Sequence, residues 1–213
     1  MAPTQNVLRA IVSIAGMVVI LAPLASVLLK IGRERGRSVG TGASLRRWPA
    51  LIMITIGLLA AGIILWRPLH LPLRTSTQYL LTWIGFVIYL PAVCLYLWGM
   101  LTLGRYFDVS STRGADLYLG HQLIKNGPFR FVRHPMYLAV LLAALGAFLV
   151  FLNWAMLIFL PMSTVVIRRA SLEEKVLETE FGDEWRAYAE QVPMWIPFGR
   201  VSLKRLPERH NLL

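Results

Sequence analysis

The chain has 213 residues, of which 56% are hydrophobic and only 15% are charged, and its mean hydropathy is +0.59. Because soluble domains carry about 25% charged residues, this composition excludes an ordinary soluble domain and favours one compact bundle in a membrane. The net charge of +11 then indicates positive loops facing anionic lipid rather than a nucleic-acid surface, and the single cysteine, Cys94, excludes an internal disulfide and a cysteine metal site.

Apolar runs along the chain predict an all-α protein, a polytopic membrane helical bundle with about five transmembrane helices. The first run covers 10–29 and is longer than a signal-peptide core, so we expect a span that is kept. A helix of about 20 residues is about 30 Å long, which is the thickness of the hydrocarbon. The remaining runs are 49–66, 79–103 with a kink expected at Pro91, 136–151 and 153–167.

The fourth and fifth runs are short, and only "LN" at 152–153 separates them, so we expect a tight helical hairpin. Beyond it, apolar residues recur at intervals of three and four. This pattern predicts a C-terminal amphipathic cytoplasmic helix that continues from the fifth span. Its apolar positions are Leu177, Phe181, Trp185, Tyr188 and Val192, with Gly182 as a point where the helix can break.

The cations are distributed unevenly between the loops. Segments 30–47, 104–135 and 168–213 hold six, five and eight of the 22 Lys and Arg residues, and only three lie elsewhere. The positive-inside rule then predicts an N-terminus outside and a C-terminus, with the long polar segments, in the cytoplasm. No predicted span contains Asp, Glu, Lys, Arg or His, which argues against a pump or an ion-coupled transporter.

The first polar segment is "HQLIKNGPFRFVRHPMY", residues 121–137. Its "NGP" at 126–128 predicts a turn, and Pro135 suits the first position of the fourth helix, where its missing N–H costs nothing. His134, directly before a proline, is expected to be extended at the mouth of that helix, whose positive end could accept an anionic group. On composition alone, the cations are better explained as anchors to lipid phosphates; they are Arg130, Arg133 and His134.

The second polar segment, residues 168–197, carries two adjacent carboxylates. In a helical register, Glu174 lies near the middle of the apolar side and Glu173 lies at its edge. Arg169 precedes Glu173 by four residues, the spacing of an ordinary ion pair worth about 0.3 kcal/mol. A carboxylate on an apolar side needs a partner, so Glu174 is expected to meet a protein cation, a bound ligand or water.

Together the two segments resemble a known family. The stretch "NGPFRFVRHPMY", followed about 30 residues later by R-x-x-x-E-E-x-x-L-x-x-x-F-G-x-E-W-x-x-Y, is similar to the isoprenylcysteine carboxyl methyltransferases. It also resembles the wider group of integral-membrane methyltransferases that includes the phospholipid N-methyltransferases. The resemblance covers about 98–198. It divides the chain into N-terminal transmembrane helices at 1–97, a methyltransferase region at 98–200 and a basic tail at 201–213.

The resemblance implies S-adenosylmethionine as methyl donor, held in a cytoplasmic cleft between the Arg-His-Pro loop and the helix with the two glutamates. It also implies a lipophilic acceptor that enters from the bilayer, and a methyl transfer that needs no metal. The implied catalytic residues are Arg169 and Glu173. The residues implied to line the donor site are His121, Gly127, Pro128, Arg133, His134, Pro135, Tyr137, Glu173 and Glu174. Ala139 and Trp185 depart from the family pattern, where glycine and tyrosine are frequent, and neither departure removes a charged group.

The acceptor and the reaction subtype stay open at this point. A carboxylate acceptor needs no base and could be oriented by an arginine, whereas an amine or a thiol needs a base. Candidates for that base are His134, Glu173 and Glu174. An isoprenylcysteine, a phospholipid, a quinone-like lipid and a small thiol all fit. Two further classes remain: an NADPH-dependent membrane reductase of the sterol-reductase-like fold, and a non-catalytic scaffold or transporter.

Overall fold

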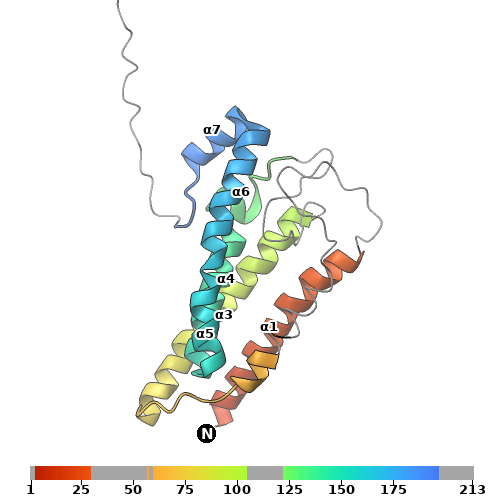
Figure 1. The fold of residues 1–213 in the computed structure, drawn as a ribbon. Coiled ribbons are helices and arrows are strands. Elements are labelled where there is room, and N and C mark those ends of the chain that lie inside the picture. The colour runs from red at the N-terminus through yellow and green to blue at the C-terminus, as the bar shows by residue number, and fades with distance from the viewer. Residues whose placement is uncertain (1–2, 30–56, 58–59, 105–121, 197–213) are drawn as a thin grey trace, which may run out of the picture.

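The computed structural model describes residues 3–29, 57, 60–104 and 122–196 of the chain. Within these residues the structure is mostly helical and contains no strand, apart from an isolated antiparallel bridge between Pro68 and Asn153. The elements, drawn in Figure 1, are α1 (Pro3–Leu29), α3 (Thr75–Leu103), the 3-10 helix η2 (Gly127–Arg130), α4 (Pro135–Phe151), α5 (Trp154–Ser163), α6 (Val165–Phe181) and α7 (Asp183–Gln191).

Three described segments are long and apolar enough to cross a membrane: Pro3–Ala22 in α1, Thr75–Leu103, and Trp154–Phe181, which joins α5 and α6. The apolar part of the third segment ends at Ile167, because Arg168 and Arg169 follow. α4 is also apolar but has only 17 residues. The predicted helical fold is therefore confirmed for the described residues, with three candidate membrane spans. The count of five spans stays a prediction, because the expected span at 49–66 lies largely outside the described residues.

Two helices begin earlier than the hydropathy pattern predicts. α1 starts at Pro3 rather than at Ala10, and α3 starts at Thr75 rather than at Tyr79. Polar residues lower the hydropathy of these first turns, but they leave intact the backbone hydrogen bonds that define a helix. α3 is continuous through Pro91, and the kink expected there stays a prediction.

The main helix pair is α3 and α4, whose backbones approach closely at two glycines. A Cβ added to Gly85 would lie 2.6 Å from the Gly146 carbonyl oxygen, and one added to Gly146 would lie 2.8 Å from the Gly85 carbonyl oxygen. Small residues at such positions let membrane helices pack by van der Waals contact. α1 lies against this pair and shares a buried cluster with it through Val12, Tyr89 and Val150.

The predicted hairpin between 136–151 and 153–167 is confirmed as α4 followed by α5. Leu152 turns the chain in a left-handed conformation, with φ 44° and ψ 52°, and α5 starts directly after Asn153. The Asn153 side chain caps α5 by accepting a hydrogen bond from the Met156 N–H at 2.8 Å. The segment before α3 braces this turn, because the Leu69 N–H donates to the Leu152 carbonyl at 2.8 Å.

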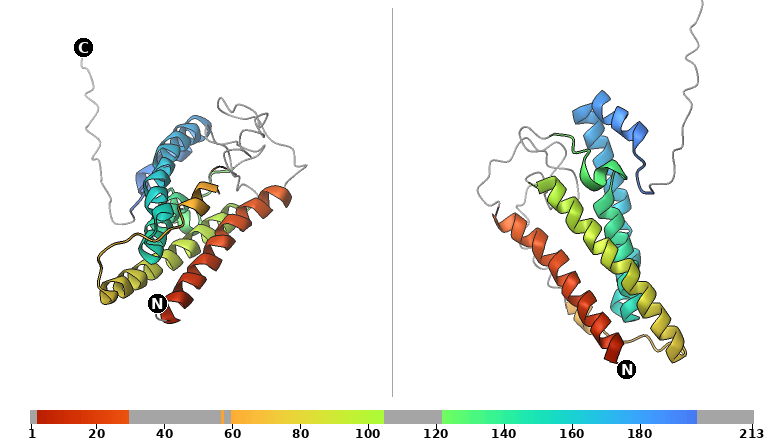
Figure 2. Two further views of the ribbon diagram at one scale, coloured as in Figure 1. Left: turned by 60° about the horizontal axis from the view of Figure 1, so that its bottom comes forward. Right: turned by 180° about the vertical axis from the view of Figure 1, so that it is seen from behind.

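α6 continues from α5, as the apolar pattern predicts, with one irregular residue between them. Pro161 in α5 has no N–H to donate, and Thr164, with φ −65° and ψ −14°, joins the two helices in a right-handed helical conformation. α6 ends at Gly182, whose φ of 51° lies in the region that favours glycine. α7 then folds back alongside the end of α6 (Figures 1 and 2).

The two ends of the bundle differ in what they hold. The N-terminus of α1 and the segment before α3 lie at one end, with Arg9, Arg67 and Arg74. The start of α4, the end of α6 and α7 lie at the opposite end (Figure 1). Segment 30–47 and parts of the other two cation-rich segments lie outside the described residues, so the predicted distribution of cations between the two sides of the membrane stays a prediction.

Candidate functional site

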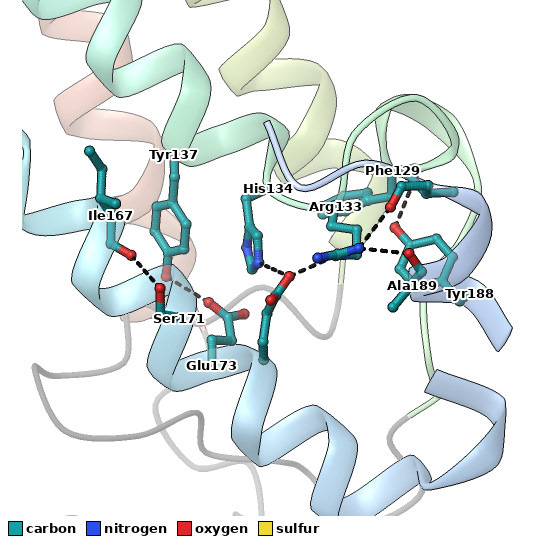
Figure 3. A network of polar contacts seen from close by, with 11 residues as sticks. Phe129, Arg133, His134, Tyr137, Ile167, Ser171, Glu173, Tyr188 and Ala189 are labelled. Atoms are coloured by element: carbon teal, nitrogen blue, oxygen red, sulfur yellow. Dashed lines mark hydrogen bonds and ion pairs between the residues drawn. The ribbon is translucent and has the colours of Figure 1, made fainter. Parts of the chain in front are cut away.

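A cluster of polar side chains forms where α6 faces the start of α4 (Figure 3). Glu174 on α6 accepts a hydrogen bond from Arg133 Nε at 2.6 Å, and its Oε1 lies 3.2 Å from His134 Nε2. At the preceding position of α6, Glu173 accepts a hydrogen bond from the Tyr137 hydroxyl at 2.8 Å. The two motif segments, 121–137 and 168–197, therefore meet, as the resemblance implies.

The loop before α4 is shaped by glycine and proline. Gly127 has φ 58°, and a Cβ there would lie 2.5 Å from the Thr102 Oγ1 atom, so both conformation and space require glycine. Pro128 is buried in the first turn of η2, which confirms the predicted turn. Pro135 begins α4 as expected. His134 before it has φ −122° and ψ 59°, which lies outside the helical region but also outside the extended conformation that the sequence predicts. These residues act through the backbone and fix where the next side chains lie.

The partner that the sequence required for Glu174 is a protein cation. The side chains of Arg133, Glu174 and His134 are 15%, 17% and 5% exposed, so the pair is largely shielded from water. Burial by itself would raise the pKa of Glu174. The hydrogen bonds from His134 and Arg133, with their charge, outweigh burial and hold the pKa of Glu174 below its ordinary value.

Aromatic rings flank this ion pair. The His134 ring stacks on the Tyr137 ring with centroids 5.6 Å apart, and the Trp195 ring lies 5.9 Å from His134 on another side. The Arg169 guanidinium lies 5.9 Å from the centre of the Tyr137 ring. Tyr137 thus contacts both expected catalytic residues, Arg169 through its ring and Glu173 through its hydroxyl.

Residues 183–196, named here the C-terminal strap, close the cluster from the side of α7. The Tyr188 hydroxyl donates to the Phe129 carbonyl at 2.7 Å, and burial raises the pKa of this phenol to about 12. The Arg133 N–H donates to the Pro193 carbonyl at 2.9 Å, and the His134 N–H donates to the Met194 carbonyl at 3.3 Å. An exposed ion pair between Lys125 and Glu184 spans the same two segments.

Sequence reasoning placed most of this cluster but missed part of it. Trp195 was not among the expected residues, although "VPMWIP" closes the segment that carries the resemblance. The strap carbonyls carry no signal in the sequence, because every residue has a carbonyl. His121 lies outside the described residues, so its expected role is untested. Among the residues that the structure does describe, no group of three His, Cys, Asp or Glu side chains is arranged to hold a metal ion.

Comparison with known proteins places this cluster in a family. A family described as phospholipid methyltransferase matches residues 80–184, which run from α3 to the start of α7. This region of the chain therefore resembles the isoprenylcysteine carboxyl methyltransferase and phospholipid methyltransferase-like family. The matched residues include Arg133, His134, Tyr137 and the two glutamates of α6, so the polar cluster lies inside the family region.

Curated members of this family show a similarity of about one residue in three. A protein-S-isoprenylcysteine O-methyltransferase of Schizosaccharomyces pombe is 32% identical over 102 residues, 46% of this chain and 42% of the relative. A probable protein-S-isoprenylcysteine O-methyltransferase of Oryza sativa subsp. indica is 33% identical over 87 residues, 37% of this chain and 42% of the relative. The chain thus spans less than half the length of these relatives. No finding favours the reductase that the sequence left open.

Proposed function

We propose that the chain is an S-adenosylmethionine-dependent integral membrane methyltransferase that acts on a lipophilic acceptor at the cytoplasmic face. The observation that carries this proposal is the meeting of His134 and Tyr137 with Glu173 and Glu174 inside the family region. The family and the names of its curated relatives support the reaction class. The excess of cations at the α7 end supports the cytoplasmic side.

The residues of the cluster fit the chemical groups of the donor. S-adenosylmethionine carries an ammonium, a carboxylate, ribose hydroxyls and a methyl group on a sulfonium sulfur, and transfer breaks that S–C bond as the acceptor bonds to the methyl carbon. The α4 N-terminus has no side-chain cap, so its first N–H groups can bind a carboxylate. Glu173 uses Oε2 for Tyr137, and its other oxygen can accept from an ammonium or a hydroxyl.

The two glutamates then have different roles. Glu174 Oε1 already faces both Arg133 and His134, and this arrangement supports a role in holding the loop before α4. Glu173 has only the neutral Tyr137 hydroxyl among its hydrogen-bond donors described above, which makes it the better partner for the donor ammonium. We therefore assign the donor contact to Glu173 and keep Glu174 as its neighbour in the site.

The rest of the expected set is proposed to surround the donor. His134 and Tyr137 contribute their stacked rings, and the backbone at Gly127, Pro128 and Pro135 forms the wall of the loop. Arg133 belongs to the same set through Glu174. These residues bring the reactants into line and exclude water, which is the main contribution that a displacement at a methyl carbon needs from a protein.

Arg169 and Glu173 are proposed to act at the reacting centre. The names of the relatives favour a carboxylate acceptor of the isoprenylcysteine type, which needs no base and which Arg169 could hold through two parallel hydrogen bonds. A lipid amine is the second acceptor class, because the family also takes the name of phospholipid methyltransferases. An amine must lose a proton, and Glu173 and His134 lie within the cluster to accept it.

Titration calorimetry on the detergent-solubilised full chain tests the donor assignment. We expect S-adenosylmethionine and S-adenosylhomocysteine to bind and NADPH not to bind. Glu173→Gln should weaken binding of S-adenosylhomocysteine by about tenfold, which corresponds to about 1.4 kcal/mol. The matched control is Glu180→Gln, an exposed glutamate on the same helix, which should bind as the wild type does. Binding of NADPH without binding of either adenosyl ligand would refute the proposal.

A further inference from the structure

Arg133 joins three parts of the molecule through one side chain (Figure 3). Its Nε donates to Glu174 on α6 at 2.6 Å, and its Nη1 donates to the carbonyls of Ala189 and Val192 in the C-terminal strap, each at 2.8 Å. The guanidinium also lies 5.8 Å from the centre of the Trp185 ring. A rigid planar fork with several donors can make these contacts together, whereas a lysine ammonium cannot hold the same geometry.

The backbone of the same loop reinforces this connection. The N–H groups of Arg133 and His134 donate to the carbonyls of Pro193 and Met194, and Tyr188 donates to Phe129. These bonds tie the strap to the loop that carries His134, the residue proposed to contact the donor. A change in the position of the strap is therefore transmitted to the site through the loop.

The strap is joined to α6 by a single glycine that packing does not require. Gly182 has φ 51° and ψ −119°, and a Cβ built there meets nothing within 4 Å. Glycine is thus needed for conformation rather than for space. The direction in which the strap leaves α6 is then set by what the strap binds, and Arg133 supplies two of the bonds that hold it.

We infer that Arg133 is a positioning residue of the proposed reaction, which orients Glu174 and holds the C-terminal strap against the loop before α4. This inference rests on the proposed function and adds a role that acts through other residues rather than through donor contact. Loss of the guanidinium leaves the shielded Glu174 with His134 as its remaining partner described above, and it takes the Arg133 donor from two strap carbonyls. Each lost hydrogen bond to a shielded group carries a desolvation cost. Glu174 is then no longer held in its orientation, and the strap is no longer held against the loop before α4.

The charged and titratable groups around Glu174 determine how ligand affinity depends on pH. Among the described residues these groups are Arg133 and His134 from the loop, Tyr188 from α7, and Glu173 with Arg169 on α6 itself. Arg133 and His134 favour the ionised carboxylate, because both can donate to it. Removing one nearby opposite charge shifts a carboxylate pKa upward by about one to three units.

The experiment compares Arg133→Met and Arg133→Lys with the matched control Arg186→Met, in the full chain. Arg186 is an exposed arginine on α7 that pairs with Glu178 and Asp183 and does not contact the loop in any described bond. Two quantities are measured. The first is the affinity for S-adenosylhomocysteine from about pH 4 to about pH 8, a range that covers the titration of carboxylates and of histidine. The second is the rate of amide hydrogen exchange in residues 189–194.

We expect Arg133→Met to weaken binding about tenfold at neutral pH and to move the acid-side loss of binding upward by about one pH unit. Arg133→Lys should lose binding at nearly the same acidic pH as the wild type, because the positive charge remains. Hydrogen exchange of its strap amides should become faster. Arg186→Met should change neither quantity. If Arg133 had only a structural role, Arg133→Met would not shift the pH at which binding is lost, and Arg133→Lys would have no shift to restore.

The inference is overturned if Arg133→Met loses binding at the same acidic pH as the wild type. It is also overturned if the strap amides of Arg133→Lys exchange at the wild-type rate. If Arg133→Met does not fold, the strap exchange of Arg133→Lys decides. A wild-type protein that binds neither adenosyl ligand overturns the proposed function instead. The hydrogen exchange result needs no ligand, so these two failures can be told apart.

Discussion

The two ends of the bundle are held together by different forces. At the hairpin end, Leu152 and Asn153 are fixed by backbone hydrogen bonds to the segment before α3 and by a neutral side-chain cap. At the α7 end, the loop before α4 is fixed by an ion pair, a guanidinium that binds three acceptors, and a phenol bonded to a carbonyl. The first arrangement is independent of protonation, whereas the second depends on Glu174 staying ionised. This difference supports the proposal that methyl transfer takes place at the α7 end.

The largest effect is expected from the close approach of α3 and α4, in the half of the bundle nearer the hairpin. Gly85→Ala places a Cβ against the Gly146 carbonyl and should lower the free energy of unfolding by about 1–3 kcal/mol at every pH. Thermal unfolding of the solubilised protein measures the loss. Gly62→Ala is the control, because a Cβ there meets nothing. Equal thermal midpoints for the two variants would show that this approach is not tight.

A comparable but pH-dependent effect is expected at the α7 end for Glu174→Gln. The pKa of Glu174 is lowered in the folded protein, so its ionised form stabilises the fold above its unfolded pKa, and this contribution disappears as pH falls through the lower folded pKa. The variant should lose about 1–3 kcal/mol at neutral pH. Its difference from the wild type should shrink as the pH falls toward about 3, the lower part of the range in which carboxylates titrate. Thermal midpoints against pH, with Glu180→Gln as control, test this. A constant difference across the range would contradict it.

A smaller and pH-independent effect is expected for the cap of α5. Asn153→Ala removes the acceptor of the Met156 N–H and should cost about 1 kcal/mol of stability. Affinity for S-adenosylhomocysteine should be unchanged, because the hairpin lies at the end opposite to the site. Asn153→Asp keeps an acceptor and should restore stability. A loss of ligand affinity in the alanine variant would mean that the two ends are coupled.

The smallest effect on stability is expected for Tyr137→Phe, which removes one hydroxyl and keeps the stacked ring. The hydroxyl positions Glu173, the residue proposed to hold the donor ammonium, so its loss should lower ligand affinity about fivefold, which corresponds to about 1 kcal/mol. The thermal midpoint should change little, because water can replace the hydroxyl at the part-buried Glu173. Calorimetry and thermal unfolding on the same sample separate the two. Tyr188→Phe should instead lower both the thermal midpoint and the ligand affinity, because that hydroxyl ties the strap to Phe129 in the loop before α4.

How much of this could be read from the sequence depends on what kind of contact is involved. The start of α4 at Pro135 and the turn at Gly127 follow from the restricted backbone of proline and glycine, and both were predicted. The need of Glu174 for a partner followed from its place on an apolar helix face. The identity of that partner, Arg133, did not, because either a ligand or a cation satisfies the same requirement.

The parts that could not be predicted depend on packing or on backbone atoms. The approach of Gly85 to Gly146 joins residues far apart in the sequence, and no periodicity marks it. The sequence marks Gly182 as a possible break but does not predict that α7 folds back along α6, since a glycine in a helical pattern signals a possible end without fixing the direction of the next helix. The strap carbonyls that bind Arg133 have no side-chain signature.

The central claim is most directly tested by methyl transfer itself. The purified full chain in lipid nanodiscs is incubated with S-adenosylmethionine labelled in its methyl group and, separately, with N-acetyl-S-farnesylcysteine or phosphatidylethanolamine. The account predicts label in one of these acceptors, with the farnesylcysteine product released by alkali as a methyl ester, and no transfer by Glu173→Gln. Absence of label from both acceptors and from the nanodisc lipids, in a protein whose wild-type fold is intact, would contradict it.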